Sequence, residues 1–224
     1  MEKRNGKIKC IICRYKKEIC FFTSELDSYF QENEFKRRKN SLVYMRKTGA
    51  SSQKIEMTFF SHPSYHRDAL AHIYPHMEIY FPNINRTAEQ FAGNLIPEKW
   101  IHTFTIRQPV QIYSQSEEFY FKDRDDHAYL KQAIINFFRK NTMPLLDNLK
   151  DERDYLKRFE KKDPRIIWDN NQYLYVTSAY INEQKFEKAR QVMENRFGKP
   201  GLRRQYADAF SFVENSCKQK IPSL

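Results

Sequence analysis

The chain has 224 residues, of which 40% are hydrophobic and 15% aromatic, and its 39 Lys and Arg outnumber its 28 Asp and Glu to give a formal net charge of +11. Eighteen Phe and fourteen Tyr provide enough apolar surface for a core, which excludes wholesale disorder. No stretch approaches the roughly 18 consecutive apolar residues of a membrane span. Three of the four Cys lie near the N-terminus, unlike the disulfide framework of a secreted mini-domain. We therefore expect a cytoplasmic protein with reduced thiols and no membrane contact.

Most of the positive charge lies at the start of the chain, where residues 1–47 hold thirteen Lys and Arg against six Asp and Glu. Residues 1–16 are expected to form a basic N-terminal arm, which in most proteins only solubilises the chain end. The densest basic run comprises Lys36, Arg37, Arg38 and Lys39. That run and the arm are also where a nucleic acid would bind, because Lys and Arg neutralise phosphates and release counterions.

Residues 17–123 are predicted to form a helix followed by an antiparallel sheet. Between Glu18 and Glu34 the apolar residues recur at steps of three and four, which is typical of one helical face. The spacing then changes to two, which predicts about five strands. They lie at Leu42–Lys47, around Ile55–Phe59, around Ile79–Phe81, at Ile101–Gln108 and at Glu117–Lys122. Their short links favour an antiparallel meander, since parallel strands need long crossovers. A short helix near Thr87–Gly93 is expected to interrupt it.

Residues 124–224 return to helical spacing. The predicted helical segments lie at Leu130–Phe138, Leu145–Phe159, Asn171–Ile181, Phe186–Phe197 and Leu202–Cys217, with Pro144 expected to break or kink the run. The two helices around Asn182 resemble one tetratricopeptide-type hairpin. The predicted fold class is therefore α+β: an N-terminal helix, an antiparallel β-meander, and a C-terminal helical bundle packed on the sheet in one compact domain.

Four histidines lie within fifteen residues, at His62, His66, His72 and His76. The i,i+4 spacing of each pair suits a metal if both pairs are helical. Pro63 and Pro75 interrupt the pairs, however, and no Cys or His-Glu-x-x-His pattern completes a ligand set. The histidines are the only metal candidates, and we interpret them as part of a loop between strands. Such a loop would contact a partner and respond to pH near 6.5.

Carboxylates and tyrosines are predicted to share one face of the sheet. Glu56, Glu78 and Glu118 alternate with the apolar residues of their strands, so they lie on the opposite face together with Tyr80 and Tyr120. Carboxylates in this position most often belong to a solvated face. The aromatic residues are either covered by the C-terminal helices or form a binding surface of the Tyr-rich kind found in protein interfaces. Paired carboxylates would do acid–base chemistry only inside a pocket that raises one pKa.

No catalytic motif accompanies these residues. The five Gly form neither G-x-G-x-x-G nor G-x-x-x-x-G-K, and there is no G-x-S-x-G elbow. We expect no cofactor and assign no catalytic residue.

One passage carries a family resemblance. The segment Tyr29–Lys47, with its Glu34-Phe35-Lys36-Arg37-Arg38 turn between a helix and an aromatic strand, and the helical hairpin around Asn182 resemble a bacterial α+β family of unknown function. That family is found among presumed immunity genes of polymorphic toxin loci, and Glu34 stands where Gly is commoner. The resemblance covers about residues 20–200. It implies a binding role with a toxin as partner, and it transfers no catalytic residues.

The function predicted from the sequence is therefore non-catalytic protein binding, of the kind by which an immunity protein occludes a toxin. Two alternatives remain open: nucleic-acid binding through the basic segments, and an unrecognised enzyme that uses the acidic residues of the sheet face.

Overall fold

The computed structural model describes residues 24–39, 41–113, 118–122 and 127–218. The predicted basic arm, as well as Cys10, Cys13 and Cys20, lies outside the described residues. The chain divides into two compact units that interleave along the sequence. Unit 1 comprises Met1–Arg46, Lys54–Met77 and Pro109–Leu145, and unit 2 comprises Lys47–Gln53, Glu78–Gln108 and Leu146–Leu224. Since these units follow contacts and not chain order, the predicted domains at residues 1–16, 17–123 and 124–224 stay a prediction.

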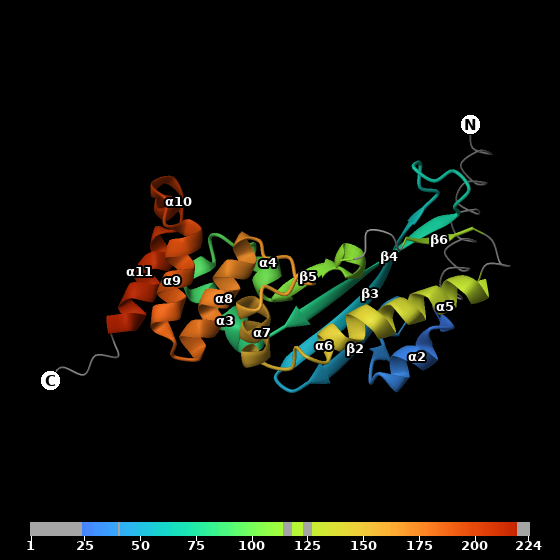
Figure 1. The fold of residues 1–224 in the computed structure, drawn as a ribbon, viewed down its shortest axis with the longest axis horizontal. Coiled ribbons are helices and arrows are strands. Elements are labelled where there is room, and N and C mark those ends of the chain that lie inside the picture. The colour runs from blue at the N-terminus through green and yellow to red at the C-terminus, as the bar shows by residue number, and fades with distance from the viewer. Residues whose placement is uncertain (1–23, 40, 114–117, 123–126, 219–224) are drawn as a thin grey trace. The chain divides into compact units, whose positions relative to one another are not determined.

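The predicted α+β class and antiparallel meander are confirmed (Figure 1). The described residues form six strands, β1 (Lys36–Arg37), β2 (Val43–Thr48), β3 (Ser51–Ser61), β4 (Ala71–Tyr80), β5 (Ile106–Pro109) and β6 (Phe119–Phe121). Their order is β1-β2-β3-β4-β5, and β6 also pairs with β4. The pairs β1–β2 and β4–β6 are antiparallel, with Lys36 opposite Met45 and His72 opposite Tyr120.

Three strands differ from the sequence prediction. The strand predicted around Ile79–Phe81 is the last part of β4, which begins at Ala71. The basic run, predicted as a turn, begins with the short strand β1. The strand predicted from Ile101 begins only at Ile106, because Glu98–Ile101 forms the helical turn α4. Pro97 precedes α4, and proline is tolerated there because the first N–H groups of a helix have no carbonyl partner within the helix.

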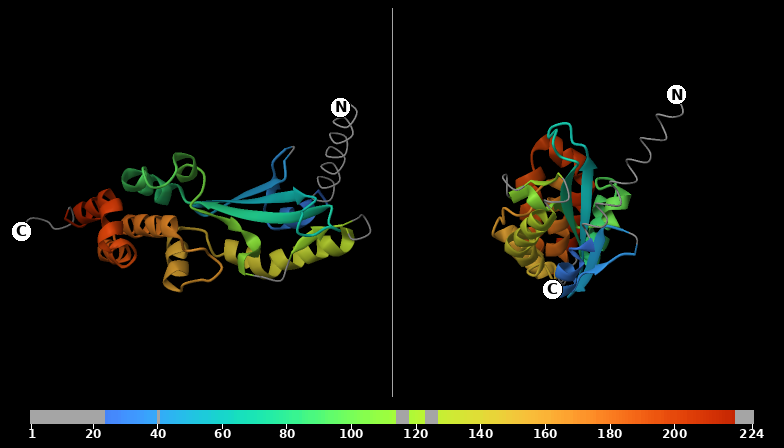
Figure 2. Two further views of the ribbon diagram at one scale, coloured as in Figure 1. Left: turned by 90° about the horizontal axis from the view of Figure 1, so that it is seen from above. Right: turned by 90° about the vertical axis from the view of Figure 1, so that its right-hand side faces the viewer.

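Unit 1 packs α2 (Asp27–Glu32), α5 (His127–Phe137) and the π-helical turn η2 (Phe138–Thr142) around aromatic side chains. The fully buried ring of Phe30 lies 4.2 Å from Tyr44 and 5.3 Å from Phe138, measured between ring centroids. Phe119 of β6 packs edge-on against Phe137 of α5 at 5.6 Å. Figure 2 shows α5 running along one face of the sheet. The π-turn ends α5 just before α6 (Met143–Leu146), which contains Pro144, where the sequence predicted a break or kink.

Unit 2 contains the remaining helices: α3 (Pro82–Ala92), α4, α7 (Glu152–Glu160), α8 (Asn170–Asn182), α9 (Phe186–Phe197), α10 (Pro200–Gln205) and α11 (Ala207–Lys218). As predicted, α8 and α9 form a hairpin around Asn182, with Ala179 and Ala189 fully buried. α3 packs on α8, and α11 packs on α9. The single helix predicted after Leu202 is two helices, because Tyr206 ends α10 and stacks on Phe197 at 4.0 Å. No helix in the described part of the chain is long and apolar enough to cross a membrane.

A buried polar network joins the elements of unit 2. The side-chain amide of Asn85 on α3 donates to the carbonyls of Ile101 and Phe104, and its oxygen accepts a hydrogen bond from the Thr105 hydroxyl. Gln172 of α8 donates to the carbonyl of Thr105 at 2.6 Å. Because every one of these buried groups has a partner, the network fixes how α3 and α8 pack.

The turn between β2 and β3 is held by the segment that precedes α7. Gly49 has a φ of 57°, and the N–H of Ala50 donates to the carbonyl of Lys150 at 2.9 Å. Ser51 and Gln53 donate to the carbonyls of Leu149 and Leu146. A Cβ on Gly49 would lie 2.8 Å from the carbonyl oxygen of Lys150, closer than real Cβ atoms come.

We predict that Gly49→Ala lowers the free energy of unfolding by about 2 kcal/mol, the combined effect of a left-handed backbone and a backbone clash. Urea denaturation of the variant and the wild type measures the change. Gly201→Ala is the matched control, since a Cβ at Gly201 of α10 meets nothing within 4 Å. It should leave stability unchanged or raise it by up to about 1 kcal/mol. Equal effects of the two substitutions would contradict the role given to the Gly49 turn.

Candidate functional site

One face of the sheet in unit 1 carries aromatic and imidazole rings. Successive side chains of a strand point to opposite faces. On β4 the residues Ala71, Ile73 and Met77 are buried hydrophobic residues, and the intervening positions hold His72, Tyr74 and His76. Rings from β3, from β6 and from the β3–β4 connection join them. We call the set the aromatic–histidine face; it consists of Phe60, Tyr65, His66, His72, Tyr74, His76 and Tyr120.

His72 is the centre of this face. Its ring centroid lies 4.8 Å from that of Tyr120, 5.6 Å from Tyr74, 5.9 Å from Tyr65 and 6.4 Å from Phe60. The ring of Tyr120 has a second imidazole neighbour, His66, at 4.1 Å. Tyr74 extends the set to His76 at 5.2 Å. The rings thus form one connected cluster across β3, β4 and β6.

The outer members of the cluster are exposed, and its centre is not. Phe60 is 54% exposed and Tyr65 64% exposed, whereas His72 is only 7% exposed. Phe60 and Tyr65 therefore expose large aromatic surfaces to solvent. The hydrophobic core of the sheet does not need these two rings, because it lies on the opposite face.

Two imidazole nitrogens in this face are buried without a hydrogen-bond partner. The Tyr65 hydroxyl lies 2.7 Å from Nδ1 of His72, but Nε2 of His72 has no partner, and neither does Nδ1 of His66. Most buried polar groups in native proteins are paired, because an unpaired one costs about 1–3 kcal/mol. The two imidazole nitrogens therefore remain available to accept or donate a hydrogen bond.

The electrostatics of the face keep His72 neutral and Tyr120 protonated. Burial lowers the pKa of His72; the Glu118 carboxylate opposes that shift, and His66 adds to it. Burial and a 2.6 Å hydrogen bond from the Tyr120 hydroxyl to Glu118 raise the pKa of Tyr120 to about 12. At neutral pH the His72 ring and the Tyr120 hydroxyl are therefore uncharged, and the Tyr120 hydroxyl is hydrogen-bonded to Glu118.

The structure brings together two groups of residues that the sequence singled out separately. Tyr120 and Glu118, predicted as partner-binding residues, lie with His66 and His72 of the histidine group. The interpretation of the histidines as a loop is wrong for His72 and His76, which lie on β4. Pro75 sits within that strand and does not interrupt it. His62 is exposed in the β3–β4 connection, with a φ of 47°.

The other predicted partner-binding residues occupy alternate positions of β3 and β4, in step with Phe60 and His72, but they are not members of the ring cluster. Glu56 of β3 is partly buried, and its carboxylate lies 3.5 Å from Nζ of Lys54. Glu78 is buried in unit 2, where it accepts a 2.9 Å hydrogen bond from Nε of Arg107. Tyr80, also in unit 2, is half-buried at the end of β4. Each of the two carboxylates thus has a cation beside it.

The basic run is exposed on and after β1. Lys36, Arg38 and Lys39 are exposed, and Nε of Arg37 lies 3.3 Å from the Asp27 carboxylate. In the sheet, two strands lie between this run on β1 and His72 on β4, and one strand, β2, lies between it and β3, which carries Phe60.

Sequence reasoning missed Tyr65, Tyr74 and the central position of His72. The signal that could have found two of them is the period-two series His72, Tyr74, His76, which matches a strand and not a helix. For metal chemistry, no group of three or more His, Cys, Asp or Glu in the described ranges is arranged to hold an ion. The one Cys that the structure describes, Cys217, is a free thiol.

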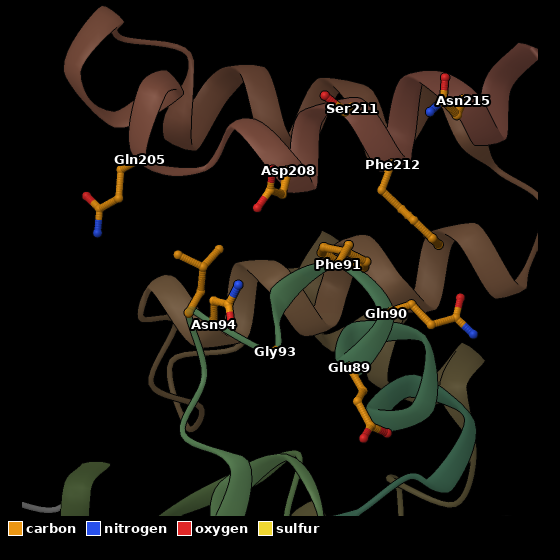
Figure 3. A pocket seen from close by; sticks show the side chains of 11 residues that line it. Glu89, Gln90, Phe91, Gly93, Asn94, Gln205, Asp208, Ser211, Phe212 and Asn215 are labelled. Carbon is orange, nitrogen blue, oxygen red and sulfur yellow. The ribbon is translucent and has the colours of Figure 1, made fainter.

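A hollow of about 500 Å³ lies in unit 2 between α3 and α11 (Figure 3). Phe91 and Phe212 stack there at 5.1 Å. Its polar lining is amides, a hydroxyl and two carboxylates, Glu89 and Asp208. Nε2 of His102 lies 3.6 Å from Glu89. This hollow holds no buried polar group without a partner, and we give it no functional role.

Comparisons of the chain with protein-family models, with curated proteins and with solved structures found no match.

We predict that His72→Phe keeps the ring packing, removes the unpaired Nε2 and also removes the Nδ1 that contacts the Tyr65 hydroxyl. Because Tyr65 is exposed and its hydroxyl can bond to water instead, the net effect should raise the free energy of unfolding at pH 7 by about 1 kcal/mol. The folded-state pKa of His72 lies below 6.5, so the unfolded state binds more protons just below pH 6.5 and the stability contributed by the neutral ring is lost as pH falls. The advantage of His72→Phe should therefore grow between pH 7 and pH 5. Urea denaturation across that range measures it; a less stable variant, or one with an unchanged pH slope, would contradict the prediction.

Proposed function

We propose that this protein is a non-catalytic protein-binding protein and that its partner docks on the aromatic–histidine face. The observation that carries the proposal is the unpaired, buried Nε2 of His72 at the centre of exposed aromatic rings. Protein interfaces are enriched in Tyr and other aromatic residues, and their central contacts lie in well-packed, desolvated positions. A partner that covers Phe60 and Tyr65 would bury their apolar surface, and its polar groups would reach the unpaired imidazole nitrogens.

The geometry favours a protein over a nucleic acid. Base stacking needs a free ring face, but the Tyr120 ring already has two imidazoles within 5 Å of its centroid. The basic run that would bind phosphates is separated by β2 from β3, which carries Phe60, and one of its members, Arg37, faces Asp27.

The same geometry supports binding over catalysis. Acid–base chemistry by paired carboxylates needs one of them raised in pKa inside a pocket. Glu56 and Glu78 instead each lie beside a cation, Lys54 and Arg107. Glu118 is exposed, and its carboxylate accepts a hydrogen bond from the hydroxyl of Tyr120.

The class of partner that we propose is a toxin. It follows from the resemblance of Tyr29–Lys47 to an immunity-associated family, in which a protein of this kind inhibits a toxin by occluding its surface. Surface complementarity without a reaction is consistent with a sequence that has no catalytic motif.

We predict that the double variant Phe60→Ala/Tyr74→Ala weakens binding of the partner about 30-fold or more, since loss of hot-spot aromatics typically costs at least about 2 kcal/mol. The partner to test is the product of a neighbouring reading frame that encodes a secreted toxin. Growth rescue on co-expression and a dissociation constant by calorimetry are the measurements.

Ile112→Ala is the matched control, because Ile112 is an exposed apolar residue of unit 1 outside the aromatic–histidine face. It should bind like the wild type. If no neighbouring toxin is neutralised, or if the double variant binds as tightly as the control, the proposal fails. Tight heparin retention with a steep salt dependence, lost on substitution of Lys36–Lys39, would support the nucleic-acid alternative in its place.

A further inference from the structure

A hollow of about 650 Å³ lies beside β6 in unit 1. One wall comes from β6 and its flanks, and the other from a single stripe of α5 and η2. The lining residues are Glu118, Phe119, Tyr120, Lys122, Tyr129, Leu130, Ala133, Asn136, Phe137 and Lys140, together with His66. Tyr129 at its rim is 80% exposed, the most exposed large apolar or aromatic side chain in the described part of the chain.

The hollow follows the free edge of β6. Tyr120 and His66 belong to the aromatic–histidine face, whereas Phe119 packs on the opposite face against Phe137 of α5. A hollow lined from both faces of a strand lies along the edge of that strand. Among the described strands, β6 pairs only with β4, so its other edge has no neighbouring strand.

The backbone of Tyr120 points toward that edge. The carbonyl of Phe121 accepts a 2.8 Å hydrogen bond from the N–H of Leu70, so the main-chain groups of Phe121 face β4. Because the main-chain groups of successive strand residues point in opposite directions, the N–H and carbonyl of Tyr120 face away from β4. An unpaired strand edge of this kind binds an extended peptide by adding it to the sheet as a further strand.

The charge of the hollow selects for acidic side chains. It carries two lysines, Lys122 and Lys140, and one carboxylate, Glu118, which is already bound by the Tyr120 hydroxyl. Nδ1 of His66, buried and unpaired, adds a further polar group on the same side. Both lysines are exposed at the rim, where a carboxylate can approach them.

On the basis of the proposed protein-binding function, we infer that the partner inserts an extended acidic segment along the free edge of β6. The main chain of that segment pairs with Tyr120, and its carboxylates meet Lys122 and Lys140. The aromatic–histidine face and the β6 edge then form one continuous docking surface, because Tyr120 and His66 belong to both.

The first test is selection of random twelve-residue peptides, displayed on phage, against the full chain. We expect the enriched peptides to alternate acidic and apolar residues, as an added strand requires. Their affinity should fall about tenfold or more for the double variant Lys122→Glu/Lys140→Glu, which reverses both charges. Lys131→Glu is the control: it makes the same charge change on α5 outside the hollow and should leave binding unchanged.

The second test separates main-chain pairing from side-chain contact. The best acidic peptide is synthesised with N-methyl groups on alternate residues, in both of the two possible phases. One phase should lose binding about tenfold or more and the other should keep it, because only every second N–H faces β6. Protection of the Tyr120 amide from hydrogen exchange should appear only with the binding peptide.

Several outcomes would overturn the inference. They are no enrichment, enriched peptides that are not acidic, equal binding to the charge-reversed variant and the control, and indifference to N-methylation in both phases. Self-association of the chain that the charge reversal abolishes would assign the edge to a second copy instead. If Phe60→Ala/Tyr74→Ala weakens binding of the partner and Lys122→Glu/Lys140→Glu does not, the proposed function stands and this inference alone fails.

Discussion

The alternation of side chains along β4 is the constraint on which the rest of unit 1 depends, because it sends apolar residues to one face of the sheet and rings to the other. Its odd-numbered residues, such as Ile73 and Met77, enter the hydrophobic interior, and its even-numbered residues place His72, Tyr74 and His76 on the other side. A slip of one residue in strand pairing would bury the imidazoles in the core and expose the aliphatic residues. The aromatic–histidine face and the stability of the sheet are therefore set by the same register.

The aromatic–histidine face is not optimised for stability alone. A phenyl ring at the position of His72 would pack as well without leaving a buried nitrogen unpaired. Proteins retain such groups mainly where binding or catalysis uses them, since functional sites are where local rules of stability are broken. The exposed rings of Phe60 and Tyr65 and the unpaired edge of β6 lie around the same residues, so three separate departures from a closed surface meet at one place.

Unit 2 contains a satisfied polar network, although Nε of Arg158 and the hydroxyl of Tyr175 are buried there without a hydrogen-bond partner. The amide, hydroxyl and carbonyl groups around Asn85 and Thr105 satisfy one another, and Asp169 accepts the N–H of Gln172 at the start of α8. The helical hairpin of α8 and α9 has fully buried alanines, Ala179 and Ala189. The satisfied network around Asn85 favours one rigid arrangement of α3 and α8.

Local periodicity in the sequence determined the α+β class, the antiparallel meander, the approximate positions of most strands and the helical hairpin around Asn182. These features depend on residues two to four positions apart, which are visible in a single chain segment. Tertiary structure alone decided that His72 lies opposite Tyr120, that Glu78 is buried against Arg107, and that the free edge of β6 faces a stripe of α5. Each of these depends on pairing between segments far apart in the chain, and the spacing of residues within one strand does not specify which residue of another strand it will face.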